Sequence, residues 1–173
     1  MDKHVISILV ENNAGVLSRV SGLFSRRGYN IDSLSVGETE DPKYSRITVV
    51  TRGDDGVITQ ICNQLKKLIV VERVIVLDPK ASVFRELTLI KVKAGAEKRS
   101  EIISIAEIFR AGIIDVSSDA LTIEVTGTQG KIKALINLLE PYGVVEIVRT
   151  GLTAIQRGDL WAQNENENDA VDE

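Results

Sequence analysis

The residues best suited to bind a small molecule lie in the turn from Glu11 to Leu17, which reads Glu-Asn-Asn-Ala-Gly-Val-Leu. An apolar segment ends here and the pattern of an amphipathic helix begins. An Asn-rich turn that ends in Gly15 leaves backbone N–H groups free at the helix N-terminus, where they can bind a carboxylate. A capped helix start with a tight turn explains the same residues without a ligand, so this segment alone leaves both interpretations open.

A second turn, Arg27-Gly28-Tyr29-Asn30-Ile31, follows the same helix and carries another amide side chain. Backbone N–H groups that hold a carboxylate, together with Asn side chains that hold an ammonium or amide group, describe a site for an amino acid. The candidate residues for binding this amino acid are Asn12, Asn13, Ala14, Gly15, Val16, Leu17, Asn30 and Ile31.

Other reactive or phosphate-binding patterns are weaker. Cys62 and His4 are the only residues of their kinds, so no Cys/His cluster can hold zinc or iron, and both residues are interpreted as structural. The segment from Gly127 to Ile132 resembles part of a phosphate loop, but its glycines are too close together and Ile132 replaces the hydroxyl that binds Mg²⁺. The pair Arg26-Arg27 could bind a phosphate, but it is also favourable in the last turn of a helix.

Two tandem units of alternating periodicity position these residues, each in the order βαββαβ. In the first unit we predict strands over 4–11, 30–36, 45–51 and 71–77, and helices over 16–24 and 58–68. In the second we predict strands over 86–92, 113–116, 121–126 and 144–149, and helices over 102–109 and 132–139.

The fold class expected from this order is α+β, with two tandem ferredoxin-like domains, each with both helices on one face of an antiparallel sheet. The other face of each sheet is left bare, which favours pairing with another copy of the chain. The expected boundaries are a first domain over 1–78, a linker over 79–83, a second domain over 84–160 and an acidic, disordered tail over 161–173.

Composition excludes several classes of function. The net charge is −4, but residues 164–173 carry five acids and no base, and the remainder holds 21 basic against 20 acidic residues. A near-neutral body lacks the basic surface of a nucleic-acid-binding protein. No apolar stretch approaches the roughly 20 residues of a membrane helix. No export or organelle signal is visible, so we expect a cytoplasmic protein without membrane contact.

The run ENNAGVLSRVSGLFSRRGYNIDSLSVGETEDPKYSRITVVT closely resembles the N-terminal ACT domain of acetohydroxyacid (acetolactate) synthase small subunits. The similarity continues through VERVIVLD and RELTLIKVKA, and RSEIISIAEIFRAGIIDVSSDALTIEVTGTQGKIKALINLLEPYGVVEIVRTG resembles that family's C-terminal domain. The resemblance implies a homodimer of ACT domains joined edge to edge, with an effector at the interface. One wall would be the turn from Asn12 to Leu17, and the other would be Asn30 and Ile31 of the neighbouring copy.

The resemblance also implies a function. The chain would be a non-catalytic regulatory subunit that activates a large catalytic subunit and confers feedback inhibition by valine in branched-chain amino acid biosynthesis. That family's reaction forms acetolactate from two pyruvates, and its thiamine diphosphate, Mg²⁺ and FAD all belong to the catalytic subunit, so no cofactor is expected here. Valine, isoleucine and leucine are not separated, since one methylene changes binding by only about 1 to 3 kcal/mol.

Three other functions are compatible with the βαββαβ order. An ACT-type amino-acid sensor that controls a different enzyme would have the same fold and would differ only in its partner. An RNA recognition motif shares the βαββαβ order but needs stacking aromatic residues, which are absent from VISILV and RITVV. A ferredoxin-like hydrolase could be imagined around Asn12 and Arg19, but no suitable phosphate cradle is present.

Overall fold

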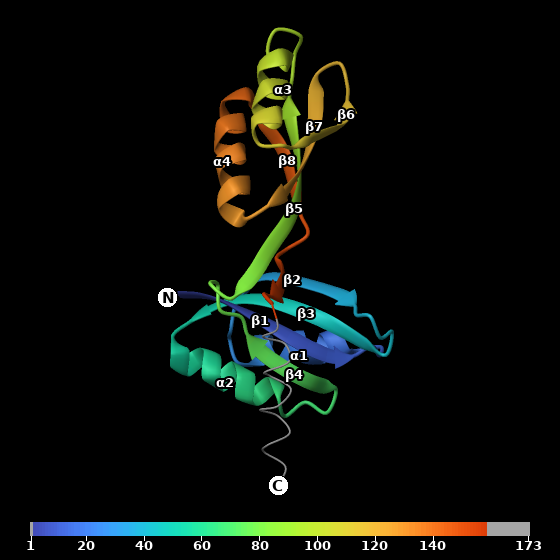
Figure 1. Cartoon of the computed structure of the whole chain (residues 1–173), viewed down its shortest axis with the longest axis vertical. Helices are drawn as coiled ribbons and strands as arrows, with labels where there is room; N and C mark the ends of the chain where they lie inside the picture. Colours follow the sequence, from blue (N-terminus) through green and yellow to red (C-terminus); the bar gives the residue numbers. More distant parts are fainter. Residues whose placement is uncertain (1, 159–173) are drawn as a thin grey trace. The chain divides into compact units, whose positions relative to one another are not determined.

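The computed structural model describes residues 2–158 and confirms the α+β fold class, with two successive βαββαβ units (Figure 1). The first unit consists of β1 (Asp2–Glu11), α1 (Val16–Arg26), β2 (Ile31–Glu38), β3 (Tyr44–Gly53), α2 (Asp55–Leu65) and β4 (Val71–Val76). The second consists of β5 (Ser82–Lys93), α3 (Arg99–Ile108), β6 (Gly112–Val116), β7 (Ala120–Gly127), α4 (Gln129–Leu139), a 3₁₀ turn η1 (Glu140–Tyr142) and β8 (Val144–Arg149). A last strand, β9 (Thr153–Gln156), was not predicted.

The strand order in each unit determines which strands lie at its edges. The first sheet has the antiparallel order β2-β3-β1-β4, and the main path of the second is β6-β7-β5-β8. In the first sheet His4 and Ile31 both pair with Thr51, whereas Glu11 pairs with Tyr44 at the opposite end. The start of β2 and the end of β1 therefore lie at opposite ends of this sheet.

The helix-covered side of the first sheet forms the core of the first unit. Side chains alternate along a strand, so Ile6, Ile8 and Val10 of β1 face the helices, and each exposes 1% or less of its surface. From α1 the core receives Val16, Val20, Leu23 and Phe24, and from α2 it receives Ile58, Ile61 and Leu65. Helix α2 ends at Leu65 and not near Leu68 as predicted, because residues 66–70 form a turn.

The second unit repeats this design with its own core. Ile90 and Val92 of β5 pack with Leu121, Ile123 and Val125 of β7 beneath helices α3 and α4. Helix α4 begins at a cap in which the Thr128 side chain accepts a hydrogen bond from Lys131 N, at 3.3 Å. The segment that resembled a phosphate loop is therefore a capped turn from strand to helix.

The compact units differ from the predicted domains at their boundaries. One unit contains residues 2–83 and 152–158, and the other contains 84–151. The expected linker belongs partly to β5, which begins at Ser82, and the end of the expected second domain packs with the first unit. Leu152 N donates to Ser33 Oγ, Ser35 Oγ donates to Leu152 O, both at 2.9 Å, and Arg157 N donates to Ala81 O at 2.8 Å.

The helix-free face of the first sheet is not bare. Val5 and Val50 alternate with the core residues of their strands, so they point away from the helices, yet they expose only 9% and 1% of their surfaces. Leu152 and Ala154 are also buried, at 4% and 6%. The prediction that this face is open to another copy is wrong for this part of the sheet.

The predicted tail over 161–173, including Trp161, lies outside the described residues. Within residues 2–158 no helix combines the length and apolar character needed to cross a membrane.

Candidate effector site

The N-terminus of α1 presents backbone N–H groups that the chain itself leaves open. Gly15 occupies the cap position with φ of 84°, in the left-handed region that favours glycine. No side chain caps the helix and no acid lies in its first turn. Val16 N donates to Asn13 O at 3.3 Å, while the N–H groups of Leu17 and Ser18 have no acceptor among residues 2–158. Such N–H groups and the partial positive charge of a helix N-terminus suit a carboxylate.

There is room for a ligand next to this turn. A Cβ atom built on Gly15 would have no heavy atom within 4 Å. Leu17 exposes 44% of its surface beside the turn, whereas Val16 is buried in the core and anchors the helix. The turn therefore offers the N–H groups of Leu17 and Ser18 beside the apolar side chain of Leu17. Val16 presents no side chain to a ligand.

Asn12 has extensive contacts within the chain. Its Nδ2 donates to Glu38 Oε1 at 3.1 Å and to Pro42 O at 3.0 Å, and its Oδ1 accepts from Ser45 Oγ at 3.1 Å. Its backbone N donates to Lys43 O at 2.7 Å. Asn12 thus joins the Gly15 turn to the turn between β2 and β3, and its side chain has mainly a structural role in this chain.

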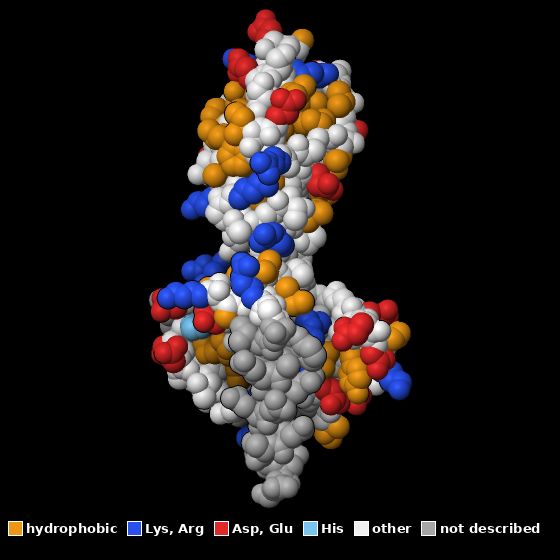
Figure 2. All heavy atoms as spheres, in the orientation of Figure 1, with side chains coloured by type: hydrophobic (Ala, Val, Ile, Leu, Met, Phe, Trp, Pro, Cys, Tyr) orange, Lys and Arg blue, Asp and Glu red, His pale blue; other side chains and the backbone are white. Residues whose placement is uncertain are grey.

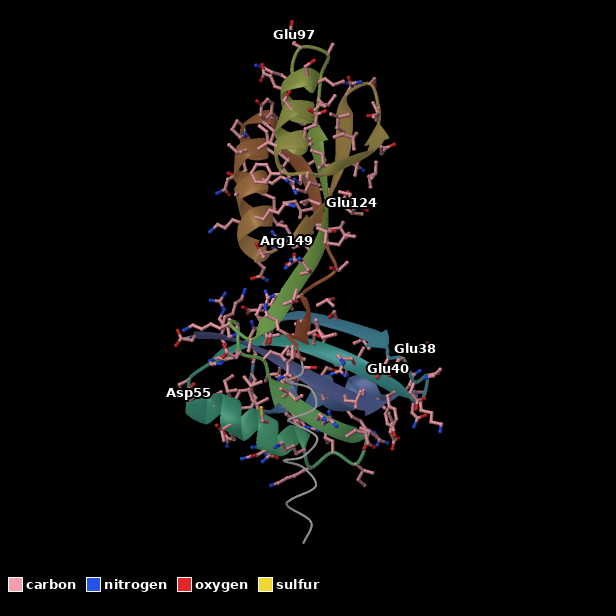
Figure 3. All side chains as sticks on the ribbon, in the orientation of Figure 1. Glu38, Glu40, Asp55, Glu97, Glu124 and Arg149 are labelled. Atoms are coloured by element: carbon pink, nitrogen blue, oxygen red, sulfur yellow. The ribbon has the colours of Figure 1, made fainter. Side chains whose placement is uncertain are left out.

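The same end of the first unit is acidic. Figure 3 labels Glu38 and Glu40 there, and Figure 2 shows acidic side chains gathered over this region. Asn13 is held locally, because its Nδ2 donates to Glu11 Oε2 at 2.8 Å. Ala14 is exposed between these groups.

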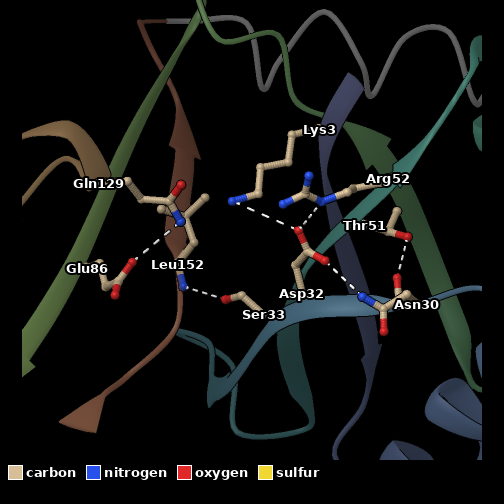
Figure 4. Close-up of polar contacts among 9 residues, drawn as sticks. All are labelled: Lys3, Asn30, Asp32, Ser33, Thr51, Arg52, Glu86, Gln129 and Leu152. Carbon is tan, nitrogen blue, oxygen red and sulfur yellow. Dashed lines mark hydrogen bonds and ion pairs between the residues drawn. The ribbon is translucent and has the colours of Figure 1, made fainter. Parts of the chain in front are cut away.

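Asn30 lies just before β2 in a second polar network (Figure 4). Its Nδ2 donates to Asp32 Oδ1 at 2.9 Å, and its backbone oxygen accepts from Thr51 Oγ1 at 2.7 Å. Arg52 Nε donates to Asp32 Oδ2 at 2.7 Å, and Lys3 Nζ lies 4.0 Å from the same oxygen. The hydrogen bond from Arg52 is the main cause that holds the pKa of Asp32 below its ordinary value of 3.8.

The two predicted walls lie at opposite ends of one sheet. Asn12 follows Glu11, which pairs with Tyr44, and Asn30 precedes Ile31, which pairs with Thr51 next to His4. The seven steps along the strand from His4 to Glu11 correspond to roughly 23 Å at about 3.3 Å per residue. No single amino acid can contact both walls within one chain. Ile31 is half-buried against the core, so it mainly supports Asn30.

The remaining candidates do not form a site. Cys62 is half-buried on α2, and burial raises the pKa of its thiol, which makes it a poor nucleophile. Across residues 2–158 no three His, Cys, Asp or Glu side chains are grouped to hold a metal ion. Sequence reasoning missed the partners Asp32, Arg52 and Glu38. Of these three, only Asp32 could have been found from the sequence, because it is an acid two residues after Asn30 within a predicted strand.

Comparison with known proteins covers almost the whole described chain. A family model described as an AHAS small subunit-like ACT domain matches residues 6–73, and one described as the small subunit of acetolactate synthase matches residues 85–158. A crystal structure of the acetolactate synthase small subunit from Thermotoga maritima is 46% identical, with a TM-score of 0.85, and the match covers 91% of this chain and 99% of that one.

Curated relatives of this chain also carry the name acetolactate synthase small subunit. The probable acetolactate synthase small subunit of Methanothermobacter thermautotrophicus is 54% identical over 158 residues, which is 91% of this chain and 94% of the relative. The acetolactate synthase small subunit of Mycobacterium bovis is 50% identical over 155 residues, which is 90% of this chain and 92% of the relative. The chain belongs to the family of acetolactate synthase small subunits, and its first unit is an ACT domain.

Proposed function

We propose that this chain is the regulatory subunit of an acetolactate synthase, which activates the large catalytic subunit and makes it sensitive to valine. Membership of the small-subunit family supports the choice of enzyme. The open helix N-terminus at Gly15 supports an effector with a carboxylate, and the exposed Leu17 supports an aliphatic side chain. Asn30 would receive the effector's ammonium group.

The observation that carries this proposal is the position of the two walls relative to the edge strand β2. Strand β2 runs from Ile31 to Glu38 and pairs on one side with β3. If the β2 strands of two copies pair antiparallel about a two-fold axis, the start of one strand lies beside the end of the other. Asn30 of one copy then approaches Glu38 of its partner, and Glu38 is bonded to Asn12.

A homodimer formed in this way would bring together two walls that are about 23 Å apart in a single chain. It would contain two equivalent effector sites. It would also avoid the helix-free face of the first sheet, part of which the chain's own residues occupy.

The proposed division of labour leaves the chemistry to the catalytic subunit, which would hold thiamine diphosphate, Mg²⁺ and FAD and form acetolactate from pyruvate. Valine would act by binding one state of the complex more tightly than another, since an effector without differential affinity shifts no equilibrium. This coupling would provide feedback in branched-chain amino acid biosynthesis.

A sensor for a different enzyme would have the same site and the same dimer. The similarity to acetolactate synthase small subunits along both units favours the synthase as partner.

The test has two parts. Valine should bind the isolated chain in calorimetry and raise its melting temperature, with a stabilisation of about 2.7 kcal/mol at 100 times the dissociation constant. Addition of the chain to the large subunit should raise the rate of acetolactate formation, and valine should then lower it. Absence of binding by valine, isoleucine and leucine at millimolar concentration would contradict the proposed effector site. Absence of activation would contradict the proposed partner.

A further inference from the structure

The network around Asp32 determines which end of the Asn30 amide faces the Asp32 carboxylate. An ionised carboxylate only accepts hydrogen bonds, and the lowered pKa of Asp32 keeps this group ionised at neutral pH. The group of Asn30 that faces Asp32 Oδ1 at 2.9 Å must therefore be the NH₂ group. The other carboxylate oxygen is occupied by Arg52 Nε at 2.7 Å, so Asp32 cannot turn away without losing that bond.

The orientation of the amide leaves Asn30 Oδ1 as the end without a hydrogen-bond donor among residues 2–158. Asn30 is an exposed residue, while Asp32 exposes only 16% of its side-chain surface although its backbone lies on the edge strand. Figure 4 shows Lys3 and Arg52 directed at Asp32, with the Nδ2 of Asn30 directed at the same carboxylate. The end of the amide that is turned away from Asp32 is thus a hydrogen-bond acceptor.

We propose that Asp32 is a positioning residue that holds the Asn30 oxygen toward the effector, so that the site selects an α-ammonium group over an α-keto group. This inference rests on the proposed function, because it concerns the same effector site. The α-keto acid with valine's isopropyl side chain carries the same carboxylate as valine. It differs at the one atom that would meet Asn30.

Selection follows from donor and acceptor chemistry. The ammonium group of valine donates to the Asn30 oxygen in a charge-assisted hydrogen bond. The keto oxygen of the analogue is an acceptor, so it would face another acceptor and leave both without a partner. A site built to hydrogen-bond one group rejects the analogue that lacks it far more strongly than an apolar pocket rejects a methylene.

Asp32→Asn should reverse this arrangement. The new side chain has one oxygen, and the Arg52 N–H can only donate, so the oxygen turns toward Arg52 and the NH₂ group turns toward Asn30. The amide of Asn30 then rotates to accept that bond, and its own NH₂ group faces the effector. Valine loses its acceptor and the keto acid gains a donor.

The experiment is calorimetry on the full chain with valine and with 3-methyl-2-oxobutanoate. Wild type should prefer valine, and Asp32→Asn should lower the ratio of valine to keto-acid affinity by about tenfold or more, the loss expected for a hydrogen bond to a charged group. Asp32→Glu, which keeps the carboxylate, should retain the preference. Glu72→Gln removes one exposed negative charge from β4 and is the matched control, with a ratio equal to wild type.

The outcomes separate the two proposals. If wild type binds no valine, the proposed function fails and this inference with it. If wild type binds valine and Asp32→Asn weakens both ligands equally, the role of Asp32 is merely structural and the inference alone is overturned. Should Asp32→Asn fail to melt cooperatively, Asp32→Ala replaces it. This variant frees the amide to rotate, so an unchanged ratio would overturn the inference as well.

Discussion

Replacement of Gly15 by Asp should weaken valine binding while leaving the fold intact. The left-handed φ of 84° at Gly15 costs a non-glycine residue about 1 to 2 kcal/mol. An acid at the start of a helix regains about 0.3 to 1 kcal/mol, and the new Cβ meets no atom within 4 Å. The net loss of stability should therefore be about 1 kcal/mol, which lowers the melting temperature by only a few degrees.

The effect on binding should be much larger. The new carboxylate would occupy the open space beside the helix N-terminus, where the effector's own carboxylate is expected. Two like charges about 4 Å apart repel by about 1 kcal/mol in bulk water and about 4 kcal/mol at an effective dielectric constant of 20. Valine affinity should fall between about fivefold and a thousandfold, because 1.4 kcal/mol corresponds to a factor of ten.

The matched control is Gly15→Asn, which has the same shape, also tolerates the left-handed conformation and carries no charge. Both variants should be measured by thermal melting, by valine calorimetry and by acetolactate formation with the large subunit across a range of valine concentrations. The Asp variant should still activate the enzyme, resist valine and bind it more weakly than the Asn variant does. A folded Gly15→Asp chain with wild-type inhibition would refute the site.

Three further predictions concern stability. Because the pKa of Asp32 is lowered from 3.8 by Arg52, Asp32 should contribute stability that is present above pH 3.8 and lost as the pH falls through its folded value. Denaturant unfolding at several pH values should show that this pH-dependent stability is missing in Asp32→Asn. Equal pH profiles of the unfolding free energy for wild type and Asp32→Asn would contradict the prediction. Leu152→Ala should destabilise the first unit by about 2 to 4 kcal/mol, because Leu152 is 4% exposed; an effect below about 0.5 kcal/mol would show that this segment does not support that unit. Asp54 caps helix α2, because its side chain accepts a hydrogen bond from Val57 N at 2.9 Å. Asp54→Ala should lower the unfolding free energy measured by thermal melting by about 1 kcal/mol, whereas Asp54→Asn should retain most of the wild-type stability.

Most of the fold could be predicted because its signals are local. The central strands and the helices have an apolar period that one face of the element buries, as Ile6, Ile8 and Val10 do in β1. Strand β9 could not be predicted, because Thr153–Gln156 is only four residues long and pairs with a strand far away in the chain. The predicted end of α2 at Leu68 is wrong, because Leu68 continues the apolar period of the helix although its backbone forms a turn.

The site residues could be nominated but their contacts could not. The turn ending in Gly15 is a local signal, and its left-handed backbone agrees with the glycine. The bonds from Asn12 to Glu38 and to Pro42 join residues 26 and 30 positions apart, and no sequence period encodes them. The network of Asp32 with Arg52 similarly depends on strand pairing, which brings β2 beside β3.

The central claim is that each effector site takes the Gly15 turn from one copy and Asn30 from the other. Intersubunit complementation tests it most directly, with Gly15→Asp and Asn30→Ala chains unfolded together, refolded and titrated with valine in a calorimeter. Each variant alone should bind valine more weakly than wild type does. In a random mixture about half the dimers are mixed, and each mixed dimer has one wild-type site, so about a quarter of the sites should bind with wild-type affinity. A mixture that binds no more valine than the separate variants would contradict a site shared between two copies.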